Sequence, residues 1–175
     1  MREGGARHTT SPDDVDDIVA AWQRERPDLD VRPLQVLSRV GRLARRLDQA
    51  RSAAFAAHEL EIWEFDVLSA LRRAGSPYEL SPGRLAEATL VTSGTMTNRI
   101  DRLQARDLVT RRPSRRDRRG VIVGLTPAGL DCVDAALTTL LEHERTLLAG
   151  LDQARRDRLA ELLRRLQAGL GAGER

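Results

Sequence analysis

The stretch that decides the fold spans residues 81–125 and reads SPGRLAEATLVTSGTMTNRIDRLQARDLVTRRPSRRDRRGVIVGL. Its opening Ser-Pro pair combines a capping hydroxyl with a proline at the first helical position, which predicts a short helix over 81–90. A Val-Thr turn then leads into a second helix, predicted over 93–106. Two short helices joined by a tight turn form a helix-turn-helix.

A hairpin is predicted directly after the two helices. β-rich segments over 108–112 and 120–125 flank a polar loop that is dense in arginine. The order of helix-turn-helix and hairpin is typical of a winged helix. The sequence therefore predicts a mainly α fold with a small β-wing.

Amphipathic helices are predicted on both sides of this segment. Near the N-terminus, Ser11 and Pro12 resemble a helix start, and Val15, Val19 and Trp22 share one face of the helix that follows. The other flanking helices are predicted from residue 33 to beyond 50, over 62–74, from the Thr-Pro pair at 126 to about 150, and from an Asp cap at 152 to about 168.

Composition excludes several classes of protein. No segment approaches the ~20 apolar residues of a membrane span, and the N-terminus lacks the apolar region of a signal peptide, so we expect a cytoplasmic protein. A single cysteine forms no internal disulfide and is too few for a metal cage, so no metal or cofactor is expected. The three histidines are far apart and no nucleophile motif is present, so no catalytic residues are predicted and the protein is not expected to be an enzyme.

Basic charge is concentrated in the helix-turn-helix and hairpin. Residues 84–119 contain ten arginines and four acidic residues, a local balance of +6, whereas the whole chain carries +3. A basic block of this kind indicates a polyanionic partner, and arginine pairs well with phosphate and with guanine edges. Double-stranded DNA is the partner that this position in the chain favours.

The second helix of the motif has a buried face and a polar face. Met96, Ile100 and Leu103 cluster on one side at about 100° per residue and are expected to anchor the helix. Asparagine can pair with adenine edges and arginine with guanine edges, so the other side suits the major groove, although a merely solvated polar face is the alternative. The predicted DNA-binding residues on this helix are Ser93, Gly94, Thr95, Thr97, Asn98 and Arg102.

The hairpin provides the other predicted contacts with DNA. Arginines at positions 111, 112, 115, 116, 118 and 119 surround one aspartate and would repel one another, so phosphates are expected to supply their counter-charge. An arginine at the tip can enter a narrow minor groove, while Asp117 can orient Arg119. A flexible charged loop is the alternative. The predicted residues of the wing are Arg115, Arg116, Asp117, Arg118 and Arg119.

The flanking helices predict a homodimer. Their apolar stripes exceed what a small winged core can cover, and exposed apolar surface costs ~25 cal/mol per Å². We expect one structural unit per subunit, because 175 residues is about the size of one domain. In chain order, we assign a flexible tail over 1–12, an extra helix and a dimerisation helix over 13–57, a winged helix-turn-helix DNA-binding domain over 58–125, C-terminal dimerisation helices over 126–170 and a tail over 171–175.

Residues 60–148 closely resemble the MarR family of bacterial transcriptional regulators. The wing sequence DRRGV at 117–121 is similar to the D-x-R wing of the family, and LTPAG at 125–129 is similar to the L-T-x-x-G that begins its dimerisation helix. The resemblance implies homodimerisation through both chain ends. A two-fold dimer then implies a pseudo-palindromic operator with half-sites about 10 bp apart.

A narrower resemblance is to the urate-responsive branch of that family, the HucR and PecS type. Its marks are an extra N-terminal helix with a tryptophan and the recognition-helix string SGTMTNR, found here at 93–99. The resemblance implies a ligand site made of Trp22, Asp66, Arg99 and Arg111. In that site, a planar anion such as urate would bind the two arginines while Asp66 repels it, which would displace the recognition helix.

The residues themselves are compatible with this ligand site but leave alternatives open. Asp66 lies between Phe65 and Val67 on a core helix, where an unpaired carboxylate is costly and an arginine partner is expected. The same residues can form an ordinary ion-pair cluster, with Trp22 as a core anchor. We therefore expect a repressor released from its operator by urate or a related anion. The alternatives are a phenolic, carboxylate or antibiotic effector, a redox response through Cys132, which also fits a buried small hydrophobic residue, or a non-regulatory interaction protein.

Overall fold

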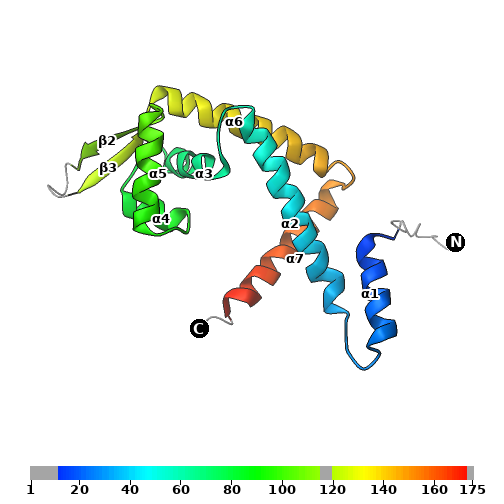
Figure 1. The fold of residues 1–175 in the computed structure, drawn as a ribbon. Coiled ribbons are helices and arrows are strands. Elements are labelled where there is room, and N and C mark those ends of the chain that lie inside the picture. The colour runs from blue at the N-terminus through cyan, green and yellow to red at the C-terminus, as the bar shows by residue number, and fades with distance from the viewer. Residues whose placement is uncertain (1–11, 115–119, 173–175) are drawn as a thin grey trace. The chain divides into compact units, whose positions relative to one another are not determined.

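The structure is a computed structural model that describes residues 12–114 and 120–172. These residues are mostly helical, with one three-stranded antiparallel sheet, which confirms the predicted mainly α fold with a small β-wing. The chain divides into two compact units, Met1–Ala50 and Arg51–Arg175, and the division falls inside a helix (Figure 1). The expectation of one structural unit per subunit is therefore corrected. Every helix in the described ranges is too short or too polar to span a lipid bilayer.

The first unit contains α1 (Asp14–Glu25) and most of α2 (Pro33–Ala56). α1 begins later than the predicted start at Ser11 and Pro12, because Asp13 is the capping residue. Its carboxylate accepts hydrogen bonds from the backbone N–H of Val15 at 2.9 Å and of Asp16 at 3.2 Å, and the Asp16 carboxylate completes a capping box. An acidic cap followed by acidic residues in the first turn also complements the helix dipole.

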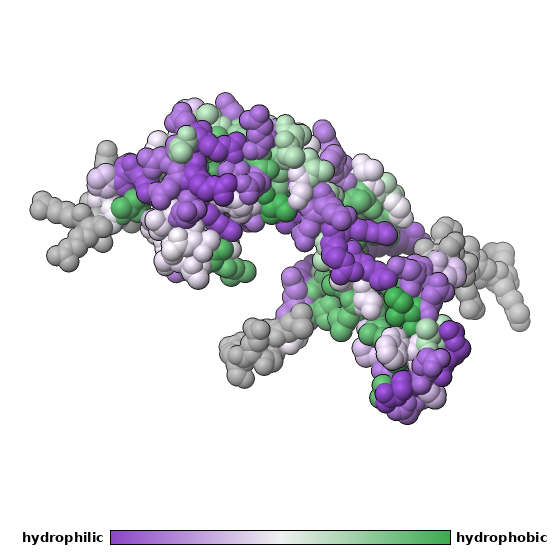
Figure 2. Space-filling view, in the orientation of Figure 1, coloured by the Kyte–Doolittle hydropathy of each residue, from purple (hydrophilic) through white to green (hydrophobic). Residues whose placement is uncertain are grey.

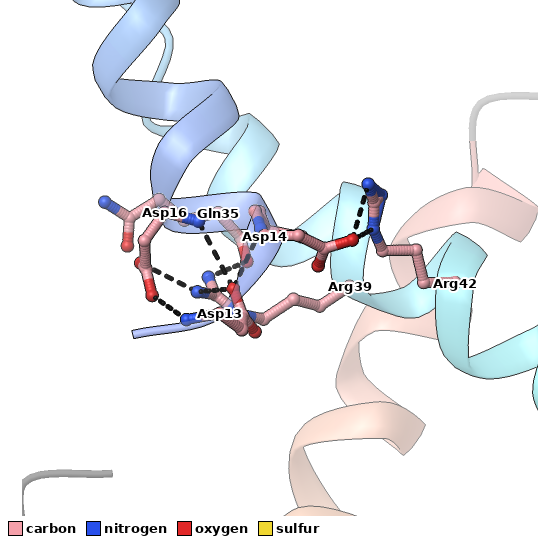
Figure 3. Close-up of polar contacts among 7 residues, drawn as sticks. Asp13, Asp14, Asp16, Gln35, Arg39 and Arg42 are labelled. Carbon is pink, nitrogen blue, oxygen red and sulfur yellow. Dashed lines mark hydrogen bonds and ion pairs between the residues drawn. The ribbon is translucent and has the colours of Figure 1, made fainter. Parts of the chain in front are cut away.

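A small apolar core and an ion-pair cluster hold the elements of the first unit together. Val15 and Val19 of α1 are buried with Val31, and Leu34 packs against them. Figure 3 shows the cluster: Arg39 of α2 contacts Asp13 and Asp16, each at 2.8 Å, and Arg42 contacts Asp14 at 2.9 Å. Of the predicted apolar stripe on α1, Trp22 remains 49% exposed.

The second unit has one core, built around three short helices. α3 (Ile62–Arg73), α4 (Pro82–Ala88) and α5 (Ser93–Ala105) lie beside the sheet in Figure 1. α4 begins as predicted, with Ser81 as the cap and proline at the first helical position. The fully buried side chains of this core come from the end of α2, from these three helices and from the strands: Phe55, Leu68, Leu71, Leu85, Met96, Ile100, Leu103, Val67, Val109 and Val123.

The sheet contains the predicted hairpin and one additional strand. β2 (Val109–Pro113) and β3 (Val121–Leu125) are antiparallel neighbours, with Thr110 opposite Gly124. β1 (Glu79–Leu80) pairs with the other edge of β3, so the order is β1-β3-β2. β1 was not predicted, since two residues are too few to show an alternating pattern.

Two long helices follow the hairpin. α6 (Pro127–Leu147) begins at the predicted Thr-Pro pair, where the hydroxyl of Thr126 accepts a 2.9 Å hydrogen bond from the N–H of Gly129. α7 (Gln153–Ala172) begins after the predicted cap, Asp152, and continues two residues past the predicted boundary at 170. Figure 2 shows hydrophobic side chains at the surface of the molecule. On α6, the α6–α7 turn and α7 the exposed ones are Leu137, Leu141, Leu147, Leu148, Leu159, Leu162 and Leu163.

Candidate nucleic-acid interface

α5 presents the two faces that its sequence predicts. Met96, Ile100 and Leu103 are fully buried and fix the helix on the core of the second unit. The helix begins at the cap Thr92, whose hydroxyl accepts from the backbone N–H of Thr95 at 3.3 Å. Because the apolar side faces the core, the polar side of α5 faces solvent, and this polar face is the candidate interface.

Five of the six residues predicted on this helix form an exposed set of small polar positions at its N-terminal half. Thr97 donates its hydroxyl to the carbonyl of Ser93 at 3.0 Å. A methyl group built on Gly94 would meet nothing within 4 Å, so the fold of the chain does not require glycine there. The exposed residues are Ser93, Gly94, Thr95, Thr97 and Asn98.

The sixth, Arg102, is exposed but already has partners within the chain. Its side chain is 53% exposed, and it donates a 2.6 Å hydrogen bond to the carboxylate of Glu61. Its guanidinium also lies 4.7 Å from the ring centre of Trp63, in cation–π geometry. Base reading by Arg102 would therefore require the ion pair with Glu61 to open.

The start of α3 contains two carboxylates that were not singled out from the sequence. Glu61 and Glu64 form a capping box, in which the Glu64 carboxylate accepts from the backbone N–H of Glu61 at 2.9 Å. Glu64 is 2% exposed, and its charge is paired with Arg106 at the end of α5, at 2.8 Å. The E-x-x-E spacing is a recognisable capping signal, although it does not reveal the burial or the distant partner.

The environment of Glu61 stabilises its charged form. The indole N–H of Trp63 donates to its carboxylate at 2.7 Å, and Arg102 donates to the other oxygen. These two hydrogen bonds, that of Trp63 first, hold the pKa of Glu61 below its usual value of 4.5. The carboxylate is therefore ionised at neutral pH and holds Arg102 by charge as well as by hydrogen bonding.

A cavity beside α3 and α5 contains two of the four predicted ligand residues. It has a volume of about 600 Å³, and Trp63, Asp66 and Arg99 line it together with Ser52 and Glu61. The guanidinium of Arg99 lies 5.4 Å from the ring centre of Trp63. An arginine and an aromatic ring on the walls of one cavity suit a small planar anion, which the two carboxylates there would repel.

The expected arginine partner of Asp66 is present, but it comes from a different part of the chain. Arg51, near the end of α2, donates to the Asp66 carboxylate at 3.1 Å, and both side chains are partly exposed. The structure therefore does not show the alternative arrangement, in which Asp66, Arg99 and Arg111 form one ion-pair cluster. Arg51 was not singled out, because it is fifteen residues away on another helix.

The other two predicted ligand residues come from other elements of the chain. Arg111 of β2 forms an ion pair with Asp101 at 2.7 Å and donates to the carbonyl of Thr97 at 3.2 Å, and it is absent from the residues that line the cavity. These contacts attach the base of the hairpin to α5. Trp22 belongs to the first unit, on α1. The ligand roles of these residues remain predictions.

The arginines at the base of the hairpin find carboxylates within the chain. Arg112 pairs with Glu79 of β1, with Nε to Oε1 at 3.0 Å, just as Arg111 pairs with Asp101. For these two arginines, the expectation that phosphates supply the counter-charge is corrected. The predicted wing residues Arg115, Arg116, Asp117, Arg118 and Arg119 lie outside the described residues.

Cys132 has the surroundings of a packing residue. It is half-buried against the core, and its Sγ lies 3.9 Å from the carbonyl oxygen of His58. Burial raises the pKa of the thiol, which disfavours the reactive thiolate. Among the described residues, no group of histidine, cysteine and acidic side chains is arranged to hold a metal ion.

Comparisons with known proteins agree on one family. Residues 58–120 match the MarR family. The chain is 36% identical to the HTH-type transcriptional regulator PecS of Dickeya dadantii, over 90% of this chain and 95% of PecS. It is 33% identical to the HTH-type transcriptional repressor NicR of Pseudomonas putida, over 79% of this chain and 88% of NicR.

A solved structure of similar fold comes from Bordetella bronchiseptica. It is the regulator BpsR, described in a study of how 6-hydroxynicotinic acid regulates its DNA binding. The TM-score is 0.58 at 32% sequence identity, and the match covers 74% of this chain and 98% of the BpsR chain. These similar proteins are regulators rather than enzymes, in agreement with the prediction from the sequence.

Proposed function

The chain belongs to the MarR family of transcriptional regulators, and from this premise we propose that it is a homodimeric repressor released from its operator by a small planar anion. The DNA-binding part of the proposal rests on α5. Its apolar side is fixed in the core, while its exposed side presents hydroxyl and amide groups and one glycine. Such a helix can enter the major groove and reach base edges from its N-terminal half.

The wing and the dipole of α5 also support DNA binding by the exposed side of this helix. The N-terminus of α5 carries unpaired backbone N–H groups and a partial positive charge, which favour phosphate. Arg111 joins the hairpin to α5 through Asp101, so the two elements would approach DNA as one piece. We assign DNA binding to residues 58–125, including the wing arginines at 115–119. A chromosomal operator as partner implies a cytoplasmic protein.

Exposed leucines support the homodimer. Leu137 and Leu141 of α6 and Leu159, Leu162 and Leu163 of α7 remain exposed in the isolated chain, as do Val36 and Leu37 of α2. Covering such surface gains about 25 cal/mol per Å², and two-fold pairing of identical chains is the commonest way to do so. We assign dimerisation to helices within 13–57 and 126–170.

The cavity beside α5 supports the effector part of the proposal. A planar anion placed over Trp63 would be attracted by Arg99 and repelled by Asp66 and Glu61, all of which line the cavity. Arg99 is on α5, so a ligand bound to it acts directly on the helix that carries Asn98. The resemblance of residues 93–99 to the urate-responsive branch favours urate, and we propose Trp22 and Arg111 as further contacts.

A different anion is the second candidate for the effector. Two observations favour it: Arg111 pairs with Asp101 and does not line the cavity, and the guanidinium of Arg102, like that of Arg99, lies near the ring centre of Trp63. A carboxylate on an aromatic ring, as in a phenolic acid, would pair with Arg99 beside the indole, and could also draw Arg102 from its ion pair with Glu61. A redox response through Cys132 receives no support, because burial raises the pKa of the thiol.

Selection from random duplexes tests the proposal. The purified chain should enrich one pseudo-palindromic sequence, prefer it over a scrambled duplex, and release it when urate or an aromatic acid is added. Loss of preference for any sequence would contradict the DNA-binding proposal. Sequence-specific binding that persists in millimolar urate would exclude urate and leave the other anions to be tested in the same assay. Arg99→Ala should keep the operator preference and lose the response to the active anion.

A further inference from the structure

The turn between α4 and α5 carries an aliphatic side chain that the fold of the chain does not use. Leu90 is 94% exposed, and its backbone φ is 53°, in the left-handed region. The N–H of Leu90 donates to the carbonyl of Glu87 at 3.3 Å, and the N–H of Val91 donates to the carbonyl of Ala86 at 3.0 Å. This pair of bonds is a Schellman motif, whose left-handed position is usually glycine.

Leucine is an unfavourable choice at this position. A Cβ in the left-handed region is strained, and a side chain that remains in water gains nothing from packing. Tyr78 is also left-handed, but its ring packs under the guanidinium of Arg72 at 4.9 Å. The other two left-handed non-glycine residues of the described ranges, Glu59 and Asp107, have polar side chains. A strained backbone without local compensation points to a functional role.

Leu90 borders the candidate interface. A hollow of about 800 Å³ is lined by Leu90 together with Thr92, Ser93 and Thr95 of the α5 N-terminus. Ser93 and Thr95 are among the predicted DNA-binding residues, and Thr92 is the cap of that helix. Any duplex that receives the N-terminus of α5 must therefore come close to Leu90.

We propose that Leu90 is a specificity-determining residue that contacts the C5 methyl group of a thymine in the operator. This inference rests on the proposed function. The thymine methyl is the apolar group that base pairs display in the major groove, so it is the natural partner for an aliphatic side chain at the rim of a recognition helix. The contact would account for a leucine where the turn favours glycine.

Replacing single thymines by deoxyuracil tests the contact, because this change removes only the methyl group. With the selected operator, the wild-type chain should lose about fourfold in affinity at one thymine per half-site, the loss expected for one buried methyl group. Leu90→Gly changes both protomers of the homodimer and removes two such contacts, so it should bind the thymine operator about sixteenfold more weakly and show no further loss at that position. Leu90→Ala should also bind more weakly.

Thermal melting separates this role from a structural one. Leu90→Gly should melt at the wild-type temperature or above it, because glycine adopts the left-handed backbone without strain. If Leu90→Gly lost affinity at the same deoxyuracil positions as the wild-type chain, the proposed contact would be wrong. A lower melting temperature with unchanged operator affinity would also contradict it, and in both cases the DNA-binding proposal would survive. If the wild-type chain prefers no duplex over a scrambled one, the proposed function fails and this inference fails with it.

Discussion

Arg106 at the end of α5 donates a 2.8 Å hydrogen bond to the carboxylate of Glu64 on α3, which is 2% exposed. Four residues earlier on α5, Arg102 bonds Glu61 at the start of the same helix. The two ion pairs connect one side of the candidate reading helix to the capping box of α3. Only the outer one, with Glu61, is exposed enough to exchange partners with a ligand or with DNA.

Removing the cation from the inner pair should destabilise the fold. Arg106→Ala leaves the buried carboxylate of Glu64 without its charged partner, and a lost charged hydrogen bond costs about 2 kcal/mol. Urea unfolding should show a lower midpoint with an unchanged slope. Arg84→Ala is the matched control, since its ion pair with Glu87 is exposed on both sides and contributes little. Equal midpoints for the two variants would show that Glu64 does not depend on Arg106.

Gly129 should not tolerate a side chain. A methyl group at this position would lie 2.0 Å from the backbone oxygen of Leu108, so the start of α6 would have to move away from Leu108, the residue before β2. Gly129→Ala should destabilise the chain by about 3 kcal/mol or more. Gly150→Ala, where a methyl group meets nothing within 4 Å, should leave the unfolding midpoint nearly unchanged. A fully stable Gly129→Ala chain would contradict the close packing of α6 on the hairpin.

Gly94 should matter for DNA binding and not for folding. A methyl group there meets nothing in the free chain, and alanine is about 1 kcal/mol better than glycine inside a helix. Gly94→Ala should therefore melt at or slightly above the wild-type temperature. Operator affinity should fall about tenfold, because the methyl group would stand between the helix and base edges. Unchanged affinity would show that this turn of α5 stays clear of the DNA.

Acid should open the pair between Arg102 and Glu61. Hydrogen bonds from Trp63 and Arg102 hold the pKa of Glu61 below 4.5. As the pH falls towards 4.5, the unfolded chain therefore begins to protonate this carboxylate while the folded chain keeps it charged. The contribution of the Glu61 carboxylate to folding stability is present above pH 4.5 and is lost as the pH falls through the lowered pKa of the folded chain. Trp22→Phe leaves Trp63 as the one tryptophan of the sequence, and its fluorescence should change as the pH falls through the pKa of Glu61. Glu61→Gln should remove the transition, and an identical transition in that variant would refute the assignment.

The helices were predictable because their signals are local. Caps at Ser81, Thr92 and Thr126 and the periodic apolar residues of α5 require no knowledge of distant partners. The start of α1 was misplaced, since serine with proline and a pair of aspartates both form plausible caps. The two-residue strand β1 exists only because β3 offers it a partner.

Long-range pairing limited the prediction of the site. The buried face of α5 follows from its period, and it was correct at all three positions. An arginine partner for Asp66 was predicted and is present. Which arginine it is, Arg51, was not predictable, because no spacing rule connects the two positions. The burial of Glu64 depends on an arginine 42 positions away, and a charged residue gives no sequence signal of burial. Arg102 was placed on the correct helix, while its contact with Glu61 was not foreseen.

Hydroxyl-radical footprinting on the selected operator tests the central claim most directly. The account predicts two protected half-sites whose centres are about 10 bp apart, one helical turn, with protection lost when Asn98 is replaced by alanine. A single protected half-site would contradict the dimeric arrangement. Uniform protection that ignores sequence, or wild-type protection by the Asn98→Ala chain, would contradict reading by α5.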